Sequence, residues 1–206
     1  MYKVFNQHRA IIFTESLKNC KISKEDTLIE TNQLDDILPA YLKFMKGKKF
    51  GKLIFHVGNQ LNPFFYKFFT NFKLVRAAGG LVVNSMGELL MIKRFSKWDL
   101  PKGKIDEGEE IENGAIRECI EETALQEMSI EKEIESTYHI YDEKSVPILK
   151  RTYWFAMTTD SDNELVPQQE EGIEEVRWMN KTEVEEALKN SYDSLQELIR
   201  HNYLQQ

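Results

Sequence analysis

Residues 103–125 read GKIDEGEEIENGAIRECIEETAL, and the spacing of the acids in this stretch decides how the whole chain is interpreted. Residues three and four positions apart share one face of a helix. On such a helix, one face gathers three carboxylates: Glu118, Glu121 and Glu122. Ile116 and Ile120 fall on the opposite side and can anchor the helix to a sheet. The pattern predicts a helix with an acidic face and an apolar face.

Carboxylates crowded in this way repel one another, so the arrangement is costly without a counter-charge. Mg²⁺ or Mn²⁺ removes that cost, because hard cations prefer carboxylate oxygens. Ahead of the helix, the sequence PKGK predicts a turn at Gly103 between Lys102 and Lys104. Backbone oxygens and two ammonium groups therefore lie near the predicted metal site. Cations, lysines and a carboxylate that activates water can together cleave a phosphoanhydride.

A solvated acidic helix is the simpler alternative in a chain rich in glutamate, and the spacing argues against it. The stretch resembles the Nudix box, Gly-x5-Glu-x7-Arg-Glu-U-x-Glu-Glu-x-Gly-U, in which U is a bulky apolar residue. Seven positions satisfy the pattern: Gly103, Glu109, Arg117, Glu118, Glu121, Glu122 and Leu125. Two positions depart from it, with Ala124 in place of a glycine and Cys119 in place of a larger aliphatic residue. Neither departure removes a carboxylate, so they bear on local geometry more than on metal binding.

Two small residues in the stretch carry expectations about its local structure. A residue other than glycine in the left-handed conformation costs about 1–2 kcal/mol, so Ala124 predicts a reshaped turn after the helix. Gly114 inside the helix costs about 1 kcal/mol relative to alanine. The sequence suggests no function for that glycine.

The resemblance to the Nudix family covers residues 72–206 and implies an α/β fold, an α/β/α sandwich around a mixed sheet. Members of the family hydrolyse a nucleoside diphosphate linked to another moiety. The resemblance implies a site for Mg²⁺ or Mn²⁺ with these ligands: Glu118, Glu121, Glu122 and the carbonyl of Gly103. Arg117 and Glu109 are expected to pair and to hold the loop against the helix.

The residue that activates water varies in position across the family, and two locations stay open here. One is the box itself, through Glu121 or Glu122. The other is the later segment PQQEEGIEEVRW, which offers three carboxylates: Glu170, Glu171 and Glu174. Glu171 is the candidate base from this segment. A polar loop before an edge strand is the competing interpretation.

The segment KRFSKWDLPKGKIDEGE, which leads into the box, narrows the range of expected substrates. It looks like that of Nudix enzymes acting on diadenosine polyphosphates, diphosphoinositol phosphates or oxidised nucleoside triphosphates. Its positive charges suit a long polyphosphate and come from Lys93, Arg94, Lys102 and Lys104. Alternatively, the first two of these residues merely end a strand. Trp98 either stacks on a base or packs against the protein.

The remaining segments after residue 72 predict a sheet and a closing helix. Residues 72–94 read as two strands, a Ser-Met-Gly turn and a further strand. Two long strands are expected to form a hairpin over residues 129–141 and 148–159, and a short strand follows at 174–180. On the second hairpin strand, Tyr153 and Phe155 alternate with Trp154, so one face is expected to line the core and the other the pocket. His139 and Tyr141 on the first strand are further pocket candidates, although a packed hairpin explains them equally well.

Residues 181–204 are expected to close the chain as one amphipathic helix. Thr182 and Glu185 have the spacing of a capping box. Residues 1–71 form a separate small α/β unit, with strands at 9–16 and 51–59 and helices at 31–47 and 62–72. Its aromatic helix is expected to supply the unit's core. The alternative is that this helix forms an interface with a partner protein. Its two histidines, His8 and His56, are expected to be structural or exposed.

The composition and charge of the chain limit the cellular compartment and the binding partners that are expected. Hydrophobic residues make up 41% and charged residues 30% of the 206 residues, which is typical of a soluble globular protein. Cys20 and Cys119 form no CxxC pair, and the N-terminal residues lack the features of a signal peptide, so a cytoplasmic protein is expected. No apolar run approaches the roughly 20 residues that cross a bilayer. The net charge of −7 argues against binding to duplex nucleic acid, but not against a phosphorylated small molecule.

The sequence therefore predicts a metal-dependent pyrophosphohydrolase that acts on a nucleoside polyphosphate or a similar nucleoside-diphosphate-linked molecule. A catalytically silent Nudix module that senses nucleotides or binds a partner is the alternative, because hydrolysis does not require the extension of about seventy residues. Three roles are compatible with that extension: enlarging the substrate pocket, forming a homodimer or docking a partner. The sequence leaves the substrate and the choice among these roles open.

Overall fold

The computed structural model describes residues 1–6, 9–47 and 51–205 of the chain. By its internal contacts the chain divides into two compact units. Unit 1 comprises Met1–Val75 and Tyr138–Lys150, and unit 2 comprises Arg76–Thr137 and Arg151–Gln206. The expected boundary at residue 72 does not anticipate that the tip of a long hairpin belongs to unit 1. A division into independent domains at that residue stays a prediction.

Unit 1 is a small α/β arrangement with mixed strand directions. Its elements are β1 (Tyr2–Asn6), β2 (Arg9–Thr14), β3 (Thr27–Glu30), α1 (Ile37–Lys46), β4 (Leu53–His56) and α2 (Leu61–Phe69). β1 and β2 are antiparallel, while β2 and β3 each run parallel to β4. β1 also pairs in parallel with β9 (Ser129–Glu143) through Val4 and Tyr138. The two predicted strands and two predicted helices are confirmed, whereas β1 and β3 were not predicted.

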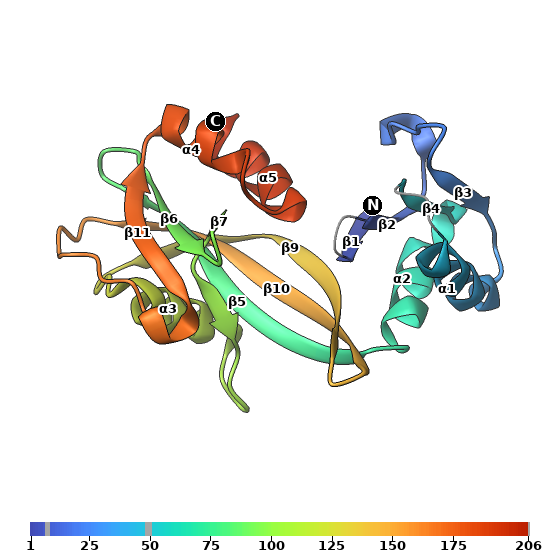
Figure 1. Ribbon diagram of the computed structural model, residues 1–206, viewed down its shortest axis with the longest axis horizontal. Helices are drawn as coiled ribbons and strands as arrows, with labels where there is room; N and C mark the ends of the chain where they lie inside the picture. The colour runs from blue at the N-terminus through green and yellow to red at the C-terminus, as the bar shows by residue number, and fades with distance from the viewer. Residues whose placement is uncertain (7–8, 48–50, 206) are drawn as a thin grey trace. The chain divides into compact units, whose positions relative to one another are not determined.

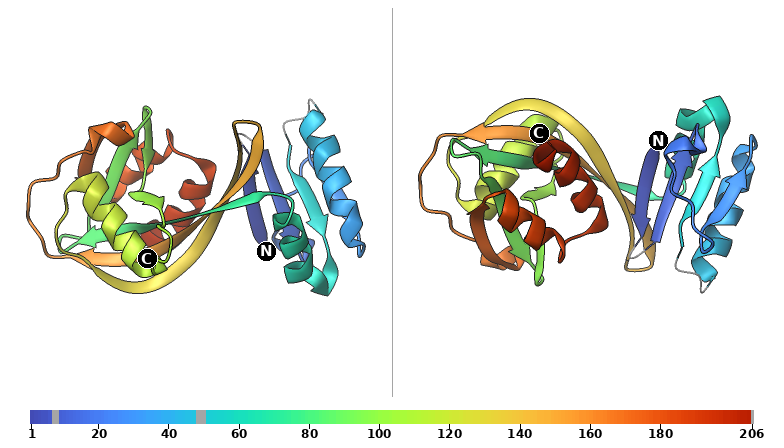
Figure 2. Two further views of the ribbon diagram at one scale, coloured as in Figure 1. Left: turned by 90° about the horizontal axis from the view of Figure 1, so that it is seen from below. Right: turned by 90° about the horizontal axis from the view of Figure 1, so that it is seen from above.

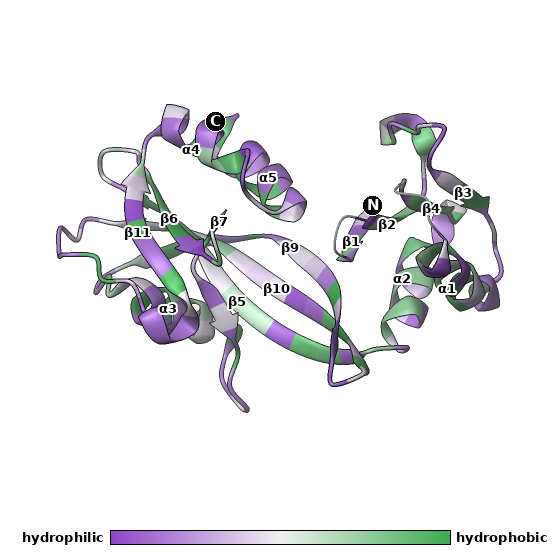
Figure 3. Ribbon diagram, in the orientation of Figure 1, coloured by the Kyte–Doolittle hydropathy of each residue, from purple (hydrophilic) through white to green (hydrophobic). Residues whose placement is uncertain are grey.

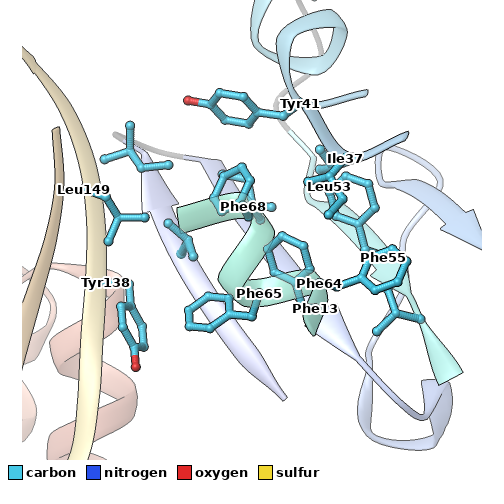
Figure 4. Close-up of a cluster of buried hydrophobic side chains, with 14 of the residues drawn as sticks. Phe13, Ile37, Tyr41, Leu53, Phe55, Phe64, Phe65, Phe68, Tyr138 and Leu149 are labelled. Atoms are coloured by element: carbon cyan, nitrogen blue, oxygen red, sulfur yellow. The ribbon is translucent and has the colours of Figure 1, made fainter. Parts of the chain in front are cut away.

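The aromatic face of α2 forms the centre of the unit 1 core (Figure 4). Phe64, Phe65 and Phe68 are buried there, and the Phe68 ring lies 5.2 Å from the ring of Phe13. The hairpin tip adds Tyr138 to the same cluster. Stripping an apolar side chain of this size from water contributes about 1.5–3 kcal/mol. The simpler interpretation of the aromatic helix, a core element, is therefore confirmed.

The two histidines named from the sequence have different outcomes. His8 lies outside the described residues. His56 is partly exposed, and its Nδ1 is 3.0 Å from Glu30 Oε1 while its Nε2 is 3.3 Å from the Glu15 carbonyl oxygen. These contacts give His56 a structural role at the end of β4.

Unit 2 is a layered structure around five strands, each hydrogen-bonded to the next. Its elements are β5 (Lys73–Asn84), β6 (Leu89–Arg94), β7 (Lys97–Asp99), β8 (Lys102–Lys104), α3 (Ile111–Thr123), β9, β10 (Val146–Thr159), β11 (Ile173–Met179), α4 (Lys181–Leu188) and α5 (Asp193–Ile199). The strand order is β11-β6-β5-β10-β9, with β7 on β6 and β8 on β5. The predicted hairpin of β9 and β10 is confirmed.

Both faces of this sheet are covered by helices, with α3 on one side and α4 and α5 on the other (Figures 1 and 2). Successive residues of a strand point to opposite faces, and both faces here are apolar. Trp154 packs with α4 and α5, whereas Phe155, the next residue, packs with α3. Accordingly, the part of β5 at residues 77–82 is apolar and buried without interruption, and Figure 3 shows hydrophobic bands along β5 and β10. The predicted α/β/α sandwich around a mixed sheet is confirmed.

Three details of the predicted elements are wrong. Residues 73–84 form one continuous strand rather than two. The closing helix is broken into α4 and α5, because the linking residues bond outside the helix: Asn190 Nδ2 donates to the Ser96 carbonyl at 2.7 Å and Ser191 Oγ to the Trp98 carbonyl at 2.8 Å. The capping box at the start of α4 is formed by Asn180 and Glu183 instead of Thr182 and Glu185. None of the helices in the described part of the chain has the length and apolar character of a membrane span.

Candidate active site

Helix α3 packs on the sheet through its smallest side chains. Ala115 and Cys119 are fully buried against β5 and β10, whereas Ile120 is 37% exposed. A Cβ on Gly80 of β5 would come within 2.9 Å of the Cys119 sulfur, so helix and strand approach closely. The expectation that Ile120 anchors the helix is wrong. The close approach also accounts for Cys119, because a larger aliphatic side chain has no room there.

The loop before α3 lies directly against two box carboxylates. A Cβ on Gly103 would come 1.8 Å from Glu118 Oε2, so the bare glycine leaves the space that the carboxylate occupies. The backbone N–H of Lys102 donates to Glu122 Oε2 at 2.8 Å. The glycine of the PKGK turn is thus required by the contact between loop and helix.

Arg117 is the centre of an ion-pair network that ties the loop to the helix. Its guanidinium donates to both oxygens of Glu109 at 2.8 and 2.9 Å, and to the Lys104 carbonyl at 3.0 Å. It also donates to Glu118 Oε1 at 2.8 Å and to Glu121 Oε2 at 3.1 Å. The predicted pairing of Arg117 with Glu109 is confirmed.

Hydrogen bonds within this network shift several pKa values. Those from Arg117, together with the backbone N–H of Asp106, lower the pKa of Glu109 to about 2. Burial raises the pKa of Glu118, an effect that Arg117 opposes.

The structure also explains the glycine at position 114 of the helix, because a Cβ there would approach Glu109 Oε2 to 3.0 Å. The helical glycine makes room for the carboxylate that Arg117 binds.

We expect Glu109→Gln to lower the free energy of unfolding at pH 7 by about 1–2 kcal/mol, because charge-assisted hydrogen bonds are lost. The pKa of Glu109 is lower in the folded protein, about 2, than the ordinary 4.5. Its stabilisation is therefore present above pH 4.5 and is lost as the pH falls toward 2. Urea unfolding at a series of pH values should show the wild-type advantage shrinking over this range. A constant difference would contradict the ion-pair assignment; Glu107→Gln, at an exposed position in the same loop, is the matched control.

The lysine of the PKGK turn is paired and largely buried. Lys102 Nζ lies 2.7 Å from Asp99 Oδ2, and Asp99 Oδ1 accepts from the Leu100 N–H at 2.8 Å. Burial alone would lower the pKa of Lys102, but the carboxylates of Asp99 and Glu122 raise it overall. Lys102 therefore remains a cation beside the box. Asp99 was missed from the sequence, where the only signal is an acid three residues before the lysine in DLPK.

Arg94 bridges the box and the later segment of acids. Its NH2 group lies 2.7 Å from Glu171 Oε2, and its NH1 group lies 3.6 Å from Glu122 Oε1. Arg94 Nε is buried and has no hydrogen-bond partner among the described residues. Glu122 is only 2% exposed, and burial raises its pKa to about 7 although Lys102 and Arg94 oppose the shift. Four predicted site residues are thus brought together: Arg94, Lys102, Glu122 and Glu171.

Other predicted site residues lie apart from this group. The ammonium of Lys93 is 5.9 Å from the ring centre of Trp98, which is partly buried against the α4 and α5 cluster. The side chain of Lys104 is exposed. Glu174 Oε1 accepts from the Ser96 N–H at 2.8 Å, which gives it a role in a turn. The packing alternative for Trp98 is therefore the one that the structure favours.

The aromatic pocket residues expected on the hairpin are mostly core residues. Trp154 and Phe155 are both buried, on opposite faces of β10, so neither face is left open at these positions. His139 and Tyr141 belong to unit 1, whereas the box belongs to unit 2. The His139 ring lies 5.8 Å from the ring of Phe5.

The donor set of the box fits a hard divalent cation. Three carboxylates and the backbone beside Gly103, whose missing Cβ leaves space for Glu118, present the oxygen ligands that Mg²⁺ and Mn²⁺ prefer. Each carboxylate is paired with a side-chain cation: Glu118 and Glu121 with Arg117, and Glu122 with Arg94. As the side chains lie, no three His, Cys, Asp or Glu residues of the described part converge on one point.

The turn after α3 keeps the left-handed conformation despite its alanine. Ala124 has φ 59° and ψ 10°, and its N–H donates to the Ile120 carbonyl at 2.8 Å. Asn163 Nδ2 donates to the Ala124 carbonyl at 2.8 Å. The expected reshaping of the turn does not occur, because these bonds hold the backbone in place.

We therefore expect Ala124→Gly to raise the free energy of unfolding by about 0.5–1 kcal/mol, since glycine adopts this conformation without steric strain. Chemical unfolding monitored by circular dichroism measures the change. Ala115→Gly, in the same helix but with ordinary helical geometry, should act in the opposite direction. A destabilised Ala124→Gly protein would show that the alanine side chain contributes contacts that outweigh the strain.

Comparison with known proteins gives the family of the chain. A model of the NUDIX domain family matches residues 73–201, more than half of the chain, so the chain belongs to the Nudix family. It is a Nudix hydrolase.

Two curated relatives illustrate the match. The chain is 31% identical over 116 residues to an RNA pyrophosphohydrolase of Wolbachia pipientis subsp. Culex pipiens (strain wPip), covering 50% of this chain and 72% of that protein. It is 29% identical over 147 residues to mRNA-decapping enzyme subunit 2 of Arabidopsis thaliana, covering 66% of this chain and 38% of that protein. Among solved structures, a C. elegans Ap4A hydrolase binary complex has a TM-score of 0.48 and 20% identity, over 61% of this chain and 93% of that one.

Proposed function

We propose that this protein is a divalent-metal-dependent pyrophosphohydrolase that cleaves a phosphoanhydride in a nucleoside polyphosphate or a related nucleoside-diphosphate-linked molecule. The observation that carries the proposal is the position of Glu122. It is a nearly fully buried carboxylate between Arg94 and the PKGK turn, on the same helix as two further carboxylates. Burial disfavours the charged form of a carboxylate, so a cation bound beside Glu122 would stabilise that form.

The residues divide into metal ligands and phosphate ligands in this proposal. The metal would be held by Glu118, Glu121, Glu122 and the carbonyl of Gly103. When bound, Mg²⁺ or Mn²⁺ would polarise a phosphoryl oxygen and neutralise phosphate charge. Arg94 and Lys102 would bind phosphate oxygens, and Asp99 would hold the Lys102 ammonium in place through the 2.7 Å contact. Lys93 and Lys104 would act on the substrate only at longer range.

Three carboxylates remain candidates for the proton acceptor that activates water: Glu121, Glu122 and Glu171. The pKa of Glu122, about 7, lies where a general base is most effective at neutral pH. Glu171 is half exposed and bound by Arg94. Glu121 is also about half exposed and is bound by Arg117.

Glutamine substitution at each position would separate the roles of base and ligand. Loss of a metal ligand should weaken Mn²⁺ binding, measured by electron paramagnetic resonance of free Mn²⁺. Loss of the base alone should lower kcat while leaving Mn²⁺ affinity unchanged. The position at which kcat falls while Mn²⁺ affinity is unchanged is the base. Weaker Mn²⁺ binding at all three positions would place the base elsewhere.

A substrate panel tests the proposed function as a whole. Turnover would be followed with Mg²⁺ and with Mn²⁺ by chromatography of the nucleotide products for nucleoside triphosphates and dinucleoside polyphosphates, and by phosphate release for diphosphoinositol phosphates. The relatives named RNA pyrophosphohydrolase and mRNA-decapping enzyme make RNA with a 5′-triphosphate or a capped end worth including. Turnover of one class supports the proposal. Tight binding without turnover across the panel would favour the silent sensor module instead.

A further inference from the structure

The turn between β6 and β7 carries an exposed aromatic side chain on a residue with positive φ. Phe95 and Ser96 have φ of 48° and 61°, so two successive residues other than glycine adopt the left-handed region. A two-residue hairpin loop favours positive φ at both positions, as Lys144 and Ser145 also show between β9 and β10, but the conformation is disfavoured for a bulky residue such as phenylalanine. The Phe95 side chain is also largely in water, with 68% of the residue exposed. Neither backbone preference nor burial explains a phenylalanine at this position.

Contacts from two other segments, one at Gly172 and Glu174 and one at Asn190, hold the strained turn in place. Glu174 Oε1 accepts from the Ser96 N–H at 2.8 Å, and Asn190 Nδ2 donates to the Ser96 carbonyl at 2.7 Å. The edge of the Phe95 ring rests on Gly172, where a Cβ would come within 2.8 Å of the ring atom Cε1. The ring is therefore held at a fixed position rather than left loose on the surface.

The ring lies at the edge of the cationic group of the candidate active site. The Arg94 guanidinium carbon is 5.4 Å from the Phe95 ring centre. The same guanidinium lies 2.7 Å from Glu171 and 3.6 Å from Glu122. Its Nε finds no hydrogen-bond partner in the described part of the chain. An exposed π-face and a phosphate-binding cation are thus carried by adjacent residues.

We propose that Phe95 is the stacking surface for the base of the substrate, with Arg94 binding a phosphate of the same molecule. This inference rests on the proposed function and narrows it to substrates that carry a base. A diphosphoinositol phosphate has no aromatic group to stack. One exposed ring is far too small for a stable protein interface, which buries about 800 Å² on each partner. It has the size and polarity that stacking on a base requires.

The test compares Phe95→Ala, Phe95→Trp and Phe95→Gly with the wild type. KM for ATP and GTP should rise about 5- to 150-fold in the alanine variant, the range expected for loss of one stacked base, while kcat stays within about twofold. The tryptophan variant should retain the wild-type KM. Inorganic tripolyphosphate, a probe without a base, should keep its inhibition constant in every variant. Tyr66→Ala, which removes another exposed aromatic residue, is the control.

The glycine variant separates stacking from strain. Phe95→Gly removes both the ring and the backbone strain, so its midpoint of thermal unfolding should rise while its KM matches that of Phe95→Ala. An unchanged KM for nucleotides in Phe95→Ala, or an equal loss of tripolyphosphate affinity, would overturn the proposal.

Failure of the proposed function can be recognised separately. If the wild type hydrolyses no nucleotide, calorimetric affinity for ATP and tripolyphosphate replaces KM. Selective weakening of ATP binding in Phe95→Ala would still support the stacking surface. Equal ATP affinities in the two proteins, or no ATP binding by the wild type, would refute it.

Discussion

Glu122→Gln is expected to lower kcat by about 10³-fold, the range associated with loss of a positioned acid–base or metal-binding group. The substitution keeps the shape of the side chain and its acceptor for the Lys102 N–H, but it removes the negative charge. The fold should therefore survive while turnover falls. Initial rates with saturating Mg²⁺ and the best substrate of the panel measure the effect.

The control is Glu112→Gln, an exposed position on the same helix, which should retain full turnover. Stability of the metal-free protein gives an independent readout. Burial raises the pKa of Glu122 to about 7 from the ordinary 4.5, so the folded protein binds this proton more tightly than the unfolded chain. The stability of the wild type relative to the variant should thus decrease between pH 4.5 and pH 7. Wild-type turnover in Glu122→Gln would remove the basis of the proposed mechanism.

Gly103→Ala should lower kcat by about 10²-fold, because small displacements of a catalytic group have effects of this size. The new Cβ would lie 1.8 Å from Glu118 Oε2 and 2.1 Å from its Cδ, so the carboxylate must move. Mn²⁺ affinity should fall together with kcat. Gly103 lies outside the left-handed region, so displacement of Glu118 rather than backbone strain is the cause.

Gly108→Ala is the matched control for this change. Gly108 lies in the same loop at φ 80°, and a Cβ added there would meet none of the described residues within 4 Å. Alanine at this position should cost about 1–2 kcal/mol of stability without moving a carboxylate, and turnover should be retained. Equal activities of Gly103→Ala and Gly108→Ala would show that the position of Glu118 does not matter.

The box was readable from the sequence because helical spacing places its charges without knowledge of the rest of the fold. The helix and its acidic face follow from spacings of three and four residues, whereas the pair of Arg117 with Glu109 was implied by the resemblance to the Nudix box. The buried face was not predictable in the same way. Hydrophobicity favoured Ile120, whereas the close approach of Gly80 selects Cys119, and that contact joins residues far apart in the chain.

Contacts made outside helices and strands could not be predicted from the sequence either. Asp99 pairs with Lys102 across Pro101, where no helical or strand period relates the two residues. The left-handed backbone of Phe95 has no sequence signal, since phenylalanine is not a turn residue. Its conformation depends on Glu174 and Asn190, which lie 78 and 94 positions after Ser96, the turn residue that they bind.

The hairpin tip assigned to unit 1 bears on how this protein can be divided. Unit 1 is discontinuous in the chain, because its core includes Tyr138 and Leu149 from the tip as well as residues of the first 75 positions. A fragment starting at residue 76 would keep these apolar side chains but lose the strand β1 that pairs with Tyr138. Unpaired apolar edges promote aggregation. A fragment starting at residue 76 is therefore expected to aggregate more readily than the full chain, because the apolar hairpin tip would lose its partner strand.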